Sequence, residues 1–263
     1  MIVFGAIVPH SPLLIPSIGK EQREKLKITL DAIAQIEQLC YLAKPETVVI
    51  IAPHGPRYPD AFSANMAGNY TGTLKSFGDF ATTIKAKSDY MIMDRAHRKM
   101  REEDIPFTLT SSEELDYGFT IPILLLTQHL QNWKLIPLSP SMMDGKAHYE
   151  FGRQMKRILH MEKRRIAIIA SADLSHKLNA QSPGGASEEG PKFDEMIKNG
   201  IVSEDSTPLL TMPAEIVENS GQCGYRPICT LLGMMDKMNV NRQLLSYEAP
   251  FGVGYLTAKF EVA

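Results

Sequence analysis

The order of apolar segments in the first 54 residues constrains the fold more than any other feature of the chain. Residues 2–8 and residues 47–52 are short, continuously apolar runs, and residues 21–44 between them repeat apolar side chains every three or four positions. The runs predict buried strands, and the repeat predicts an amphipathic helix that ends before Pro45. Strand, helix and strand in this order form a βαβ unit, whose fully apolar strands are typical of a parallel sheet covered on both faces. The sequence therefore predicts an α/β protein.

Each of these two strands ends in a Pro-His pair, and the histidines are His10 and His54. A further apolar run at residues 165–170 predicts another strand, and the Ser-Ala-Asp-Leu-Ser-His segment after it ends at His176. The carboxyl ends of neighbouring parallel strands lie at one edge of a sheet, where open α/β sheets bind their ligands. We therefore expect His10, His54 and His176 to meet at this edge.

The rest of the chain continues the alternation of helices and strands. Periodic apolar residues predict further helices at residues 89–103, 117–131, 145–162, 193–200, 206–219 and 225–238. Apolar runs predict further strands at residues 62–66, 133–138, 243–247 and 254–260. Residues 177–190 are rich in glycine and polar residues and are expected to form a mobile loop. Since no linker-like stretch divides the chain, residues 1–263 are expected to form one domain.

The charge and length of the chain exclude several classes of partner. The formal net charge is −2, so no overall field attracts nucleic acid or an anionic membrane. The 263 residues, of which 44% are hydrophobic, are typical of a globular protein with its own core. No apolar run reaches the roughly 18 residues that would cross a bilayer. We therefore expect no nucleic-acid partner and no membrane partner.

The N-terminus and the cysteines bear on location. Residues 1–15 are apolar, but they lack a basic start and are interrupted by prolines, so we expect them to belong to the mature protein. The three cysteines, Cys40, Cys223 and Cys229, are odd in number and widely spaced. Without an export signal they are expected to be reduced thiols, which favours a cytoplasmic location. A homodimer is expected only because symmetric dimers are common.

The histidines at the two strand ends indicate a metal site. Two neutral imidazoles are a natural pair of ligands for zinc, copper, nickel or iron. Cys223 lies in a turn of small residues just before a predicted helix, where the helix N-terminus favours the thiolate that binds metal. The alternatives for the third ligand are the carboxylates of Glu218 and Glu248, with Cys223 then a buried inert thiol.

Asp173 stands three residues before His176, between the predicted strand and the loop. Asp173 could orient His176 and raise the basicity of its ring. Alternatively, the two side chains could reach the site separately, or Asp173 could only stabilise a turn. Four other histidines lie within predicted helices, where a partly exposed or hydrogen-bonded side chain needs no special role. These are His97, His129, His148 and His160.

Several of these segments resemble a known family. Residues 8–14, 52–55 and 171–176 are similar to the class III extradiol ring-cleavage dioxygenases of the LigB type and to the related Memo family. The Cys-Gly-Tyr-Arg-Pro-Ile segment at residues 223–228 is closer to Memo and to the dioxygenase-like proteins associated with the AmmeMemoRadiSam system. The similarity runs in order through nearly the whole chain.

The resemblance implies a three-layer αβα sandwich around a mixed, mainly parallel sheet. In the dioxygenases two histidines and a glutamate bind a non-haem Fe(II), so His10 and His54 would be ligands here. His176 would be the catalytic base, with Asp173 nearby. Cys223 stands where the dioxygenases have the glutamate, and a thiolate is a softer ligand that also suits zinc or copper. We expect Fe(II) first, with Zn(II) or copper as the alternatives.

The segment at residues 115–118 resembles the Asp-His-Gly segment of the dioxygenases, with Tyr117 in place of the histidine, and Tyr117 is counted with the catalytic residues. The resemblance implies an oxidoreductase that cleaves the ring of a catecholic or related aromatic substrate with dioxygen. The alternative is a Memo-like metal-binding protein with a redox or interaction role and no ring cleavage. A hydrolase that uses a metal-bound hydroxide is a third possibility.

Overall fold

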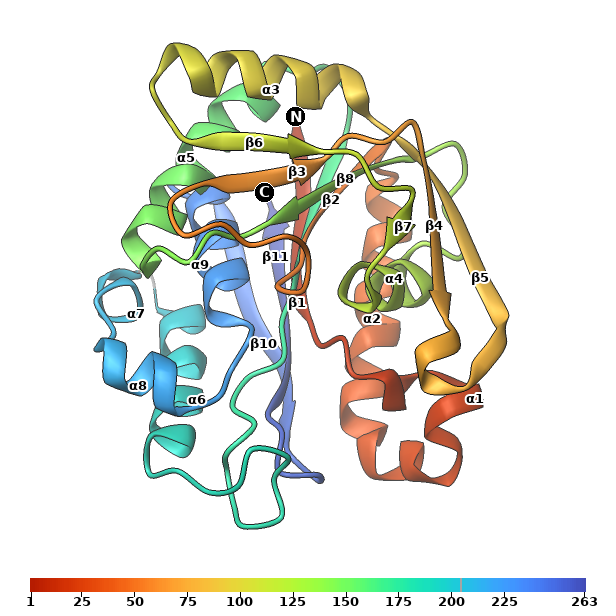
Figure 1. The fold of residues 1–263 in the computed structure, drawn as a ribbon, viewed down its shortest axis with the longest axis vertical. Coiled ribbons are helices and arrows are strands. Elements are labelled where there is room, and N and C mark those ends of the chain that lie inside the picture. The colour runs from red at the N-terminus through yellow and green to blue at the C-terminus, as the bar shows by residue number, and fades with distance from the viewer. Residues whose placement is uncertain (204) are drawn as a thin grey trace.

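A computed structural model describes residues 1–203 and 205–263 of the chain (Figure 1). The strands are β1 (Ile2–Val8), β2 (Thr47–Ile51), β3 (Phe62–Asn65), β4 (Asn69–Leu74), β5 (Asp79–Ser88), β6 (Phe107–Thr110), β7 (Glu114–Leu115), β8 (Lys134–Ser139), β9 (Ile166–Ser171), β10 (Val240–Glu248) and β11 (Tyr255–Val262). The helices are α1 (Pro16–Gly19), α2 (Lys27–Ala43), α3 (Tyr90–Glu102), α4 (Tyr117–Leu126), α5 (Gly145–His160), α6 (Glu189–Val202), α7 (Thr207–Leu210), α8 (Ala214–Asn219) and α9 (Tyr225–Met234). Single 3₁₀ segments occupy Pro12–Leu14, Lys20–Leu26 and Lys75–Phe77.

Among the described residues, the strands form one sheet in the order β10-β11-β1-β9-β2-β8-β5-β4-β7, with β3 paired to β8 and β6 paired to β3. The central strands β1, β9, β2 and β8 are parallel, whereas β11 at one side pairs antiparallel with both β1 and β10. The sheet is therefore mixed with a parallel centre, as the sequence predicts.

Helices cover both faces of this sheet. Side chains of β2 alternate between two hydrophobic cores, so that Val48 and Ile50 face one core while Val49 and Ile51 face the other. Helices α2 and α4 pack in the first core, and α3, α5, α6 and α9 pack in the second. The two groups of helices lie on opposite sides of the sheet (Figure 1). The predicted three-layer αβα sandwich is confirmed.

One prediction about the centre of the sheet is wrong. We expected β1 and β2 to be neighbours, but β9 lies between them and pairs with both, so that Ala170 is opposite Ile7 on one side and Ile51 on the other. The helical crossover between β1 and β2 is long enough to leave one strand position free, and a strand formed much later in the chain fills it. The carboxyl ends of β1, β9 and β2 therefore stand side by side.

Several helix boundaries differ from the prediction, including those of α2, α4 and the predicted helix at residues 206–219. Residues 20–26 form a 3₁₀ segment, and the long helix begins at Lys27. Helix α4 ends at Leu126 and not at residue 131. The predicted helix at residues 206–219 is divided into α7 and α8, because Pro213 has no N–H to donate to a continuing helix.

The predicted strand at residues 62–66 is β3, whereas none of the strands β4 to β7 is predicted from the sequence. These strands are short or partly exposed, so they lack the continuous apolar runs that mark the central strands. Residues 177–188 lie outside helices and strands, apart from one isolated bridge between Leu178 and Ala186. In the described parts of the chain, we find no helix with both the length and the apolar character that a membrane crossing requires.

Candidate metal centre

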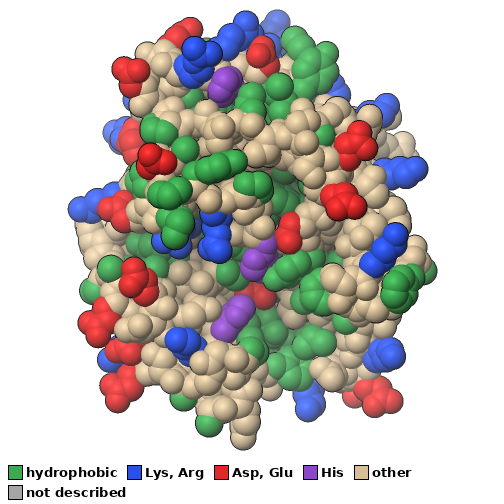
Figure 2. Space-filling view, in the orientation of Figure 1, with side chains coloured by type: hydrophobic (Ala, Val, Ile, Leu, Met, Phe, Trp, Pro, Cys, Tyr) green, Lys and Arg blue, Asp and Glu red, His purple; other side chains and the backbone are tan. Residues whose placement is uncertain are grey.

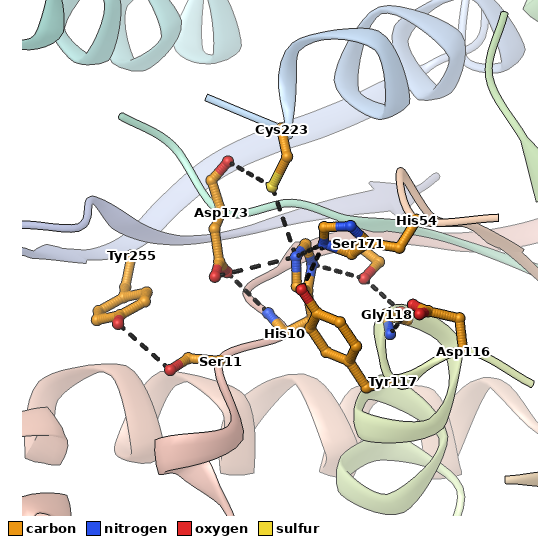
Figure 3. Close-up of polar contacts among 10 residues, drawn as sticks. All are labelled: His10, Ser11, His54, Asp116, Tyr117, Gly118, Ser171, Asp173, Cys223 and Tyr255. Atoms are coloured by element: carbon orange, nitrogen blue, oxygen red, sulfur yellow. Dashed lines mark hydrogen bonds and ion pairs between the residues drawn. The ribbon is translucent and has the colours of Figure 1, made fainter. Parts of the chain in front are cut away.

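His10 follows β1 and is held by two residues at the end of β9 (Figure 3). Its ring is buried, its backbone N–H donates to Asp173 Oδ1 at 2.9 Å, and its Nδ1 lies 2.9 Å from Ser171 Oγ. The Ser171 hydroxyl donates its one hydrogen to the Gly118 carbonyl at 2.6 Å, so it accepts a hydrogen bond from His10 Nδ1. This arrangement leaves the lone pair of His10 Nε2 free for a metal.

His54 reaches the same point from the loop after β2. Its Nε2 lies 3.1 Å from His10 Nε2 and 2.9 Å from the hydroxyl of Tyr117. Burial lowers the pKa of His10 to about 3 and also lowers the pKa of His54, so both rings are neutral at pH 7. Burial raises the pKa of Tyr117, so its phenol keeps its proton. Both imidazoles are thus in the form that binds metal.

Cys223 completes the group from the turn before α9. Its Sγ lies 3.5 Å from His10 Nε2 and donates to the Asp173 carbonyl at 3.6 Å. The predicted thiolate is not what this setting favours, because burial raises the pKa of the Cys223 thiol. Desolvation outweighs the helix N-terminus that we expected to stabilise the anion. A bound metal would have to displace the thiol proton.

The three donor atoms have the spacing of a metal site. One ligand atom from each of His10, His54 and Cys223 lies within 4.8 Å of the others. A tetrahedral zinc-type site places two imidazole nitrogens about 3.3 Å apart, and a nitrogen and a sulfur about 3.6 Å apart. The corresponding distances here are 3.1 Å between the Nε2 atoms and 3.5 Å between Cys223 Sγ and His10 Nε2. The residues fit a transition-metal ion.

Asp173 and His176 reach the site separately. Asp173 Oδ1 accepts from the His10 backbone, and Oδ2 lies 3.9 Å from His10 Nε2. Among the described residues no hydrogen bond joins Asp173 to His176, and His176 Nε2 is buried without a partner. Burial lowers the pKa of His176, although the negative charge of Asp173 raises it in part. His176 is therefore a neutral imidazole with an unused nitrogen beside the centre.

The chain before α9 is fitted closely against the end of β9. Gly221 has a φ of 65°, which turns the chain toward Cys223. A Cβ on Gly224 would lie 2.7 Å from the Asp173 carbonyl oxygen, so only glycine allows this approach. Ser175 Oγ donates to the Ser220 carbonyl at 2.8 Å and ties the two loops together. The position of Cys223 is thus set by backbone packing.

The other candidate ligands do not join this group. Glu248 accepts from the Thr29 backbone N–H at 2.6 Å, and Glu218 lines a separate cavity beside α8 and α9. Of the histidines assigned to helices, His129 Nδ1 lies 2.7 Å from Glu37 Oε1, within hydrogen-bond distance, and His148 is buried against the Asp144 carbonyl. The alternative in which Cys223 is only a buried thiol is not favoured by its place in the cluster.

Comparison with known proteins identifies the family of this chain. Residues 5–258 match the family model described as the catalytic LigB subunit of aromatic ring-opening dioxygenase. The chain belongs to the LigB family. A LigB-family assignment confirms the resemblance found in the sequence, and the MEMO1 family names of several curated relatives agree with its Memo-like branch.

Two curated relatives and one solved structure show how far the similarity extends. A Clostridium acetobutylicum protein is 25% identical over 97% of this LigB-family chain, which spans only 56% of that relative's length. A MEMO1 family protein of Methanococcoides burtonii is 24% identical, with 96% of this chain and 84% of the relative covered. The crystal structure of an uncharacterized Escherichia coli K12 protein has the same fold, with a TM-score of 0.67 and 16% identity over 98% of this chain and 99% of that one.

The sequence pattern pointed to His10, His54 and Cys223, which the structure brings together, but it gave no sign of the supporting role of Ser171. The hydroxyl of Tyr117, also predicted to belong to the site, lies 2.9 Å from His54 Nε2. Ser171 begins the Ser-Ala-Asp-Leu-Ser-His segment, yet a serine at a strand end gives no signal that it will hold a histidine ring. Its contact with Gly118 depends on a helix that is distant in sequence.

Proposed function

We propose that this LigB-family chain is a metal-dependent oxidoreductase that binds Fe(II) and cleaves the ring of a small catecholic or related aromatic substrate with dioxygen. The observation that carries the proposal is the cluster of His10 Nε2, His54 Nε2 and Cys223 Sγ at the carboxyl edge of the parallel strands. Two histidines and a third ligand on one side of an ion leave other positions open for substrate and dioxygen. The proposed catalytic roles of His176, Asp173 and Tyr117 belong to this proposal.

The metal would supply Lewis acidity toward the diol and the capacity to exchange electrons with dioxygen. The protein holds its ligands ready for this role. His10 and His54 are neutral because burial lowers the pKa of each. Ser171 fixes the tautomer of His10, and Asp173 fixes the backbone beside it.

His176 and Tyr117 are placed for proton handling. His176 is neutral, and its Nε2 has no hydrogen-bond partner in the described residues, so it can accept the proton of a diol hydroxyl. Tyr117 keeps its phenolic proton and can donate it in a hydrogen bond to a group bound beside His54. Their roles differ because one offers a lone pair and the other a hydrogen.

The space next to the cluster suits a small ring. A cavity of about 250 Å³ is lined on one side by His54, Asp116 and Phe119. Histidine side chains are visible near the middle of the face drawn in Figure 2, among hydrophobic side chains. A small aromatic molecule in this cavity would lie against His54, the one member of the cluster that lines it.

The thiol of Cys223 favours a second candidate function, that of a Memo-like metal-binding protein with a redox or interaction role. A thiolate suits zinc or copper(I) better than a carboxylate does. It is also a ligand that oxidants attack. Tyr117 in place of a histidine points the same way, because a phenol with a raised pKa is a poor base at neutral pH.

Metal analysis and substrate assays together test the two functions. The protein is purified without added metal, its metal content is measured, and Fe(II)-loaded protein is supplied with catechols under air. Bound iron with dioxygen uptake and a ring-opened yellow product would support the dioxygenase. Zinc or copper with no dioxygen uptake on any diol would overturn it in favour of the second candidate. Cys223→Glu should preserve or improve Fe(II) binding if the dioxygenase proposal is right.

A further inference from the structure

Another cavity, of about 690 Å³, lies at the amino end of β8, whereas the metal cluster lies beyond the carboxyl ends of the central strands. Lys134 is the first residue of β8 and lines this cavity, while Ser139, the last residue, lines the cavity beside His54. The two ends of an extended strand of this length are roughly 17 Å apart. The cavity at Lys134 is therefore separate from the metal site.

The pairing of β4, β5 and β8 places polar side chains in two rows on one face of the sheet. β4 and β5 lie together at the right of Figure 1. Lys87 of β5 is the register partner of both Asn69 on β4 and Lys134 on β8, and these side chains form the first row. Lys85 and Thr71 are partners in the next row on the same face. All of these residues line the cavity.

The residues that alternate with the lysines face the core. Tyr70, Ala86 and Leu135 are buried in the hydrophobic core that α2 and α4 cover. Successive side chains of a strand point to opposite faces, so the lysines of β5 and β8 are directed away from this core. Each of them is exposed or half-buried. Their ammonium groups are therefore accessible to a ligand in solution.

No carboxylate lines the cavity or pairs with these lysines. In residues 1–203 and 205–263, the lysines that form ion pairs are others. Two acidic residues stand on neighbouring segments, but Glu46 accepts from the Arg165 N–H, and Glu114 lines the cavity beside the metal cluster. Like charges on directly opposite residues destabilise a sheet. An anion bound at Lys87 and Lys134 would relieve this repulsion.

An aromatic side chain borders the same cavity. Asn132 and Trp133, in the loop before β8, complete the lining. Trp133 is half-buried and packs against the core that α2 and α4 cover. An indole ring offers a flat surface on which a planar ring can stack, and the Asn132 amide offers hydrogen-bond donors and an acceptor. The cavity thus combines an aromatic surface with a cationic one.

The spacing of the lysines matches more than one anionic group. Neighbouring strands lie about 5 Å apart, and residues two apart along a strand are separated by about 7 Å. Lys85, Lys87 and Lys134 therefore spread their charges more widely than a single phosphate or carboxylate extends. The phosphates of a nucleoside di- or triphosphate can span such an array, and the base of a nucleotide is a planar ring. The volume of about 690 Å³ lies within the range of small-molecule sites, roughly 300–1,000 Å³.

We propose that this cavity binds a nucleotide, whose phosphates contact Lys85, Lys87 and Lys134 and whose base stacks on Trp133. The site goes beyond the proposed function, because it requires neither a metal nor turnover at the cluster. Single-stranded nucleic acid has the same chemical parts. However, the lysines of the cavity are confined to β5 and the start of β8, which favours one nucleotide over a long strand.

The test uses the fluorescence of Trp133, because the chain has no other tryptophan. The metal-free protein is titrated with ATP, AMP and adenosine, and N-acetyltryptophanamide corrects for light absorbed by the nucleotide. Isothermal titration calorimetry measures each Kd independently. We expect ATP to quench Trp133 and to bind more tightly than AMP, and AMP to bind more tightly than adenosine. The affinity for ATP should weaken as salt is raised, since the contact is ionic.

Variants of the lining residues test the assignment. Lys85→Gln, Lys87→Gln and Lys134→Gln should each weaken ATP binding by about tenfold, as expected for the loss of a hydrogen bond from a charged group. Trp133→Leu, followed by calorimetry, should weaken it by about 5- to 100-fold, the range for loss of base stacking. The matched control is Lys75→Gln, because Lys75 is exposed at the other end of the β4–β5 hairpin. Circular dichroism establishes that each variant is folded.

Each outcome bears on the nucleotide site. Loss of ATP binding in the lysine variants and in Trp133→Leu, with Lys75→Gln unchanged, supports it. The absence of both quenching and binding heat with ATP overturns it, as does an ATP affinity that no lysine variant changes. Inorganic tripolyphosphate that binds as tightly as ATP would show a general anion surface and overturn the assignment of a nucleotide. Binding of a thymidine oligonucleotide without binding of ATP would overturn it in favour of single-stranded nucleic acid.

Discussion

The Nε2 atoms of His10 and His54 lie 3.1 Å apart although the two histidines follow strands that are not neighbours in the sheet. His10 cannot donate across this gap, because its hydrogen is on Nδ1 and is directed to Ser171. The nitrogen of His54 is shared between the contacts with His10 and with Tyr117. A metal ion would satisfy both lone pairs at once, which is why this pair is the centre of the proposed site.

The Ser171 hydroxyl should control metal affinity without touching the metal. Ser171→Ala removes the acceptor for His10 Nδ1–H and leaves the ring free to take the other tautomer. We expect metal affinity to fall by about 10- to 100-fold, the range found when such supporting groups are removed. Chelator competition with Zn(II) measures the change. Thr127→Ala is the control, because its buried hydroxyl also bonds a helix carbonyl but lies elsewhere. Equal losses in the two variants would contradict a tautomer-fixing role.

His176→Ala should separate proton transfer from metal binding. Because no hydrogen bond ties its Nε2 to the cluster in the described residues, metal content should remain that of the wild type. Turnover of a cleavable diol should fall by about 10²- to 10⁴-fold, as expected for the loss of a general base. Metal analysis with steady-state kinetics measures both. His160→Ala, at an exposed helix end, should change neither. A loss of metal as large as that in His10→Ala would make His176 a ligand.

Asp194 should give the protein a pH-dependent stability. Its carboxylate accepts from the Ser175 N–H and from the Tyr247 hydroxyl, and burial raises its pKa from 3.8 to about 6. The folded state therefore binds this proton more tightly than the unfolded state. The resulting stabilisation is complete below about pH 4 and is lost as the pH rises through about 6. A shift of this size corresponds to a free energy on the order of 3 kcal/mol.

The variant Asp194→Asn keeps an oxygen acceptor for Ser175 and has no such titration. Urea unfolding of both proteins from pH 4 to pH 7 measures the free energy of unfolding. The wild type should lose stability relative to the variant as the pH rises from 4 to 6.5, and the difference should then become constant. Parallel curves over the whole range would show that Asp194 titrates normally.

The sequence predicted the parts of the site that depend on local order. His10 and His54 could be located because a Pro-His pair follows each apolar strand, and Cys223 because it lies in a turn of small residues before a helix. The position of β9 between β1 and β2 could not be predicted from the sequence, because the apolar pattern of a strand does not show which strands it pairs with. The contacts of Ser171 with Gly118, and of Arg226 with the loop after β8, depend on that arrangement of segments. The protonated state of Cys223 depends on burial, which no local pattern reports.

Gly224 should be required for the position of Cys223. A methyl group at Gly224 would lie 2.7 Å from both the Asp173 carbonyl oxygen and the Ala172 Cβ, and the backbone of β9's end cannot move aside without disturbing the bond to His10. Gly224→Ala should therefore push the start of α9 away from the sheet and withdraw the thiol from His10. We expect stability to fall by about 1–3 kcal/mol, as for other overpacked positions. We also expect Zn(II) affinity to fall by at least tenfold.

The matched control is Gly68→Ala, because a Cβ there would meet nothing within 4 Å. Chelator competition and urea unfolding on both variants measure the two effects. A Gly224→Ala protein that binds Zn(II) like the Gly68→Ala protein would show that Cys223 keeps its place without this close approach, or that the thiol is not a ligand.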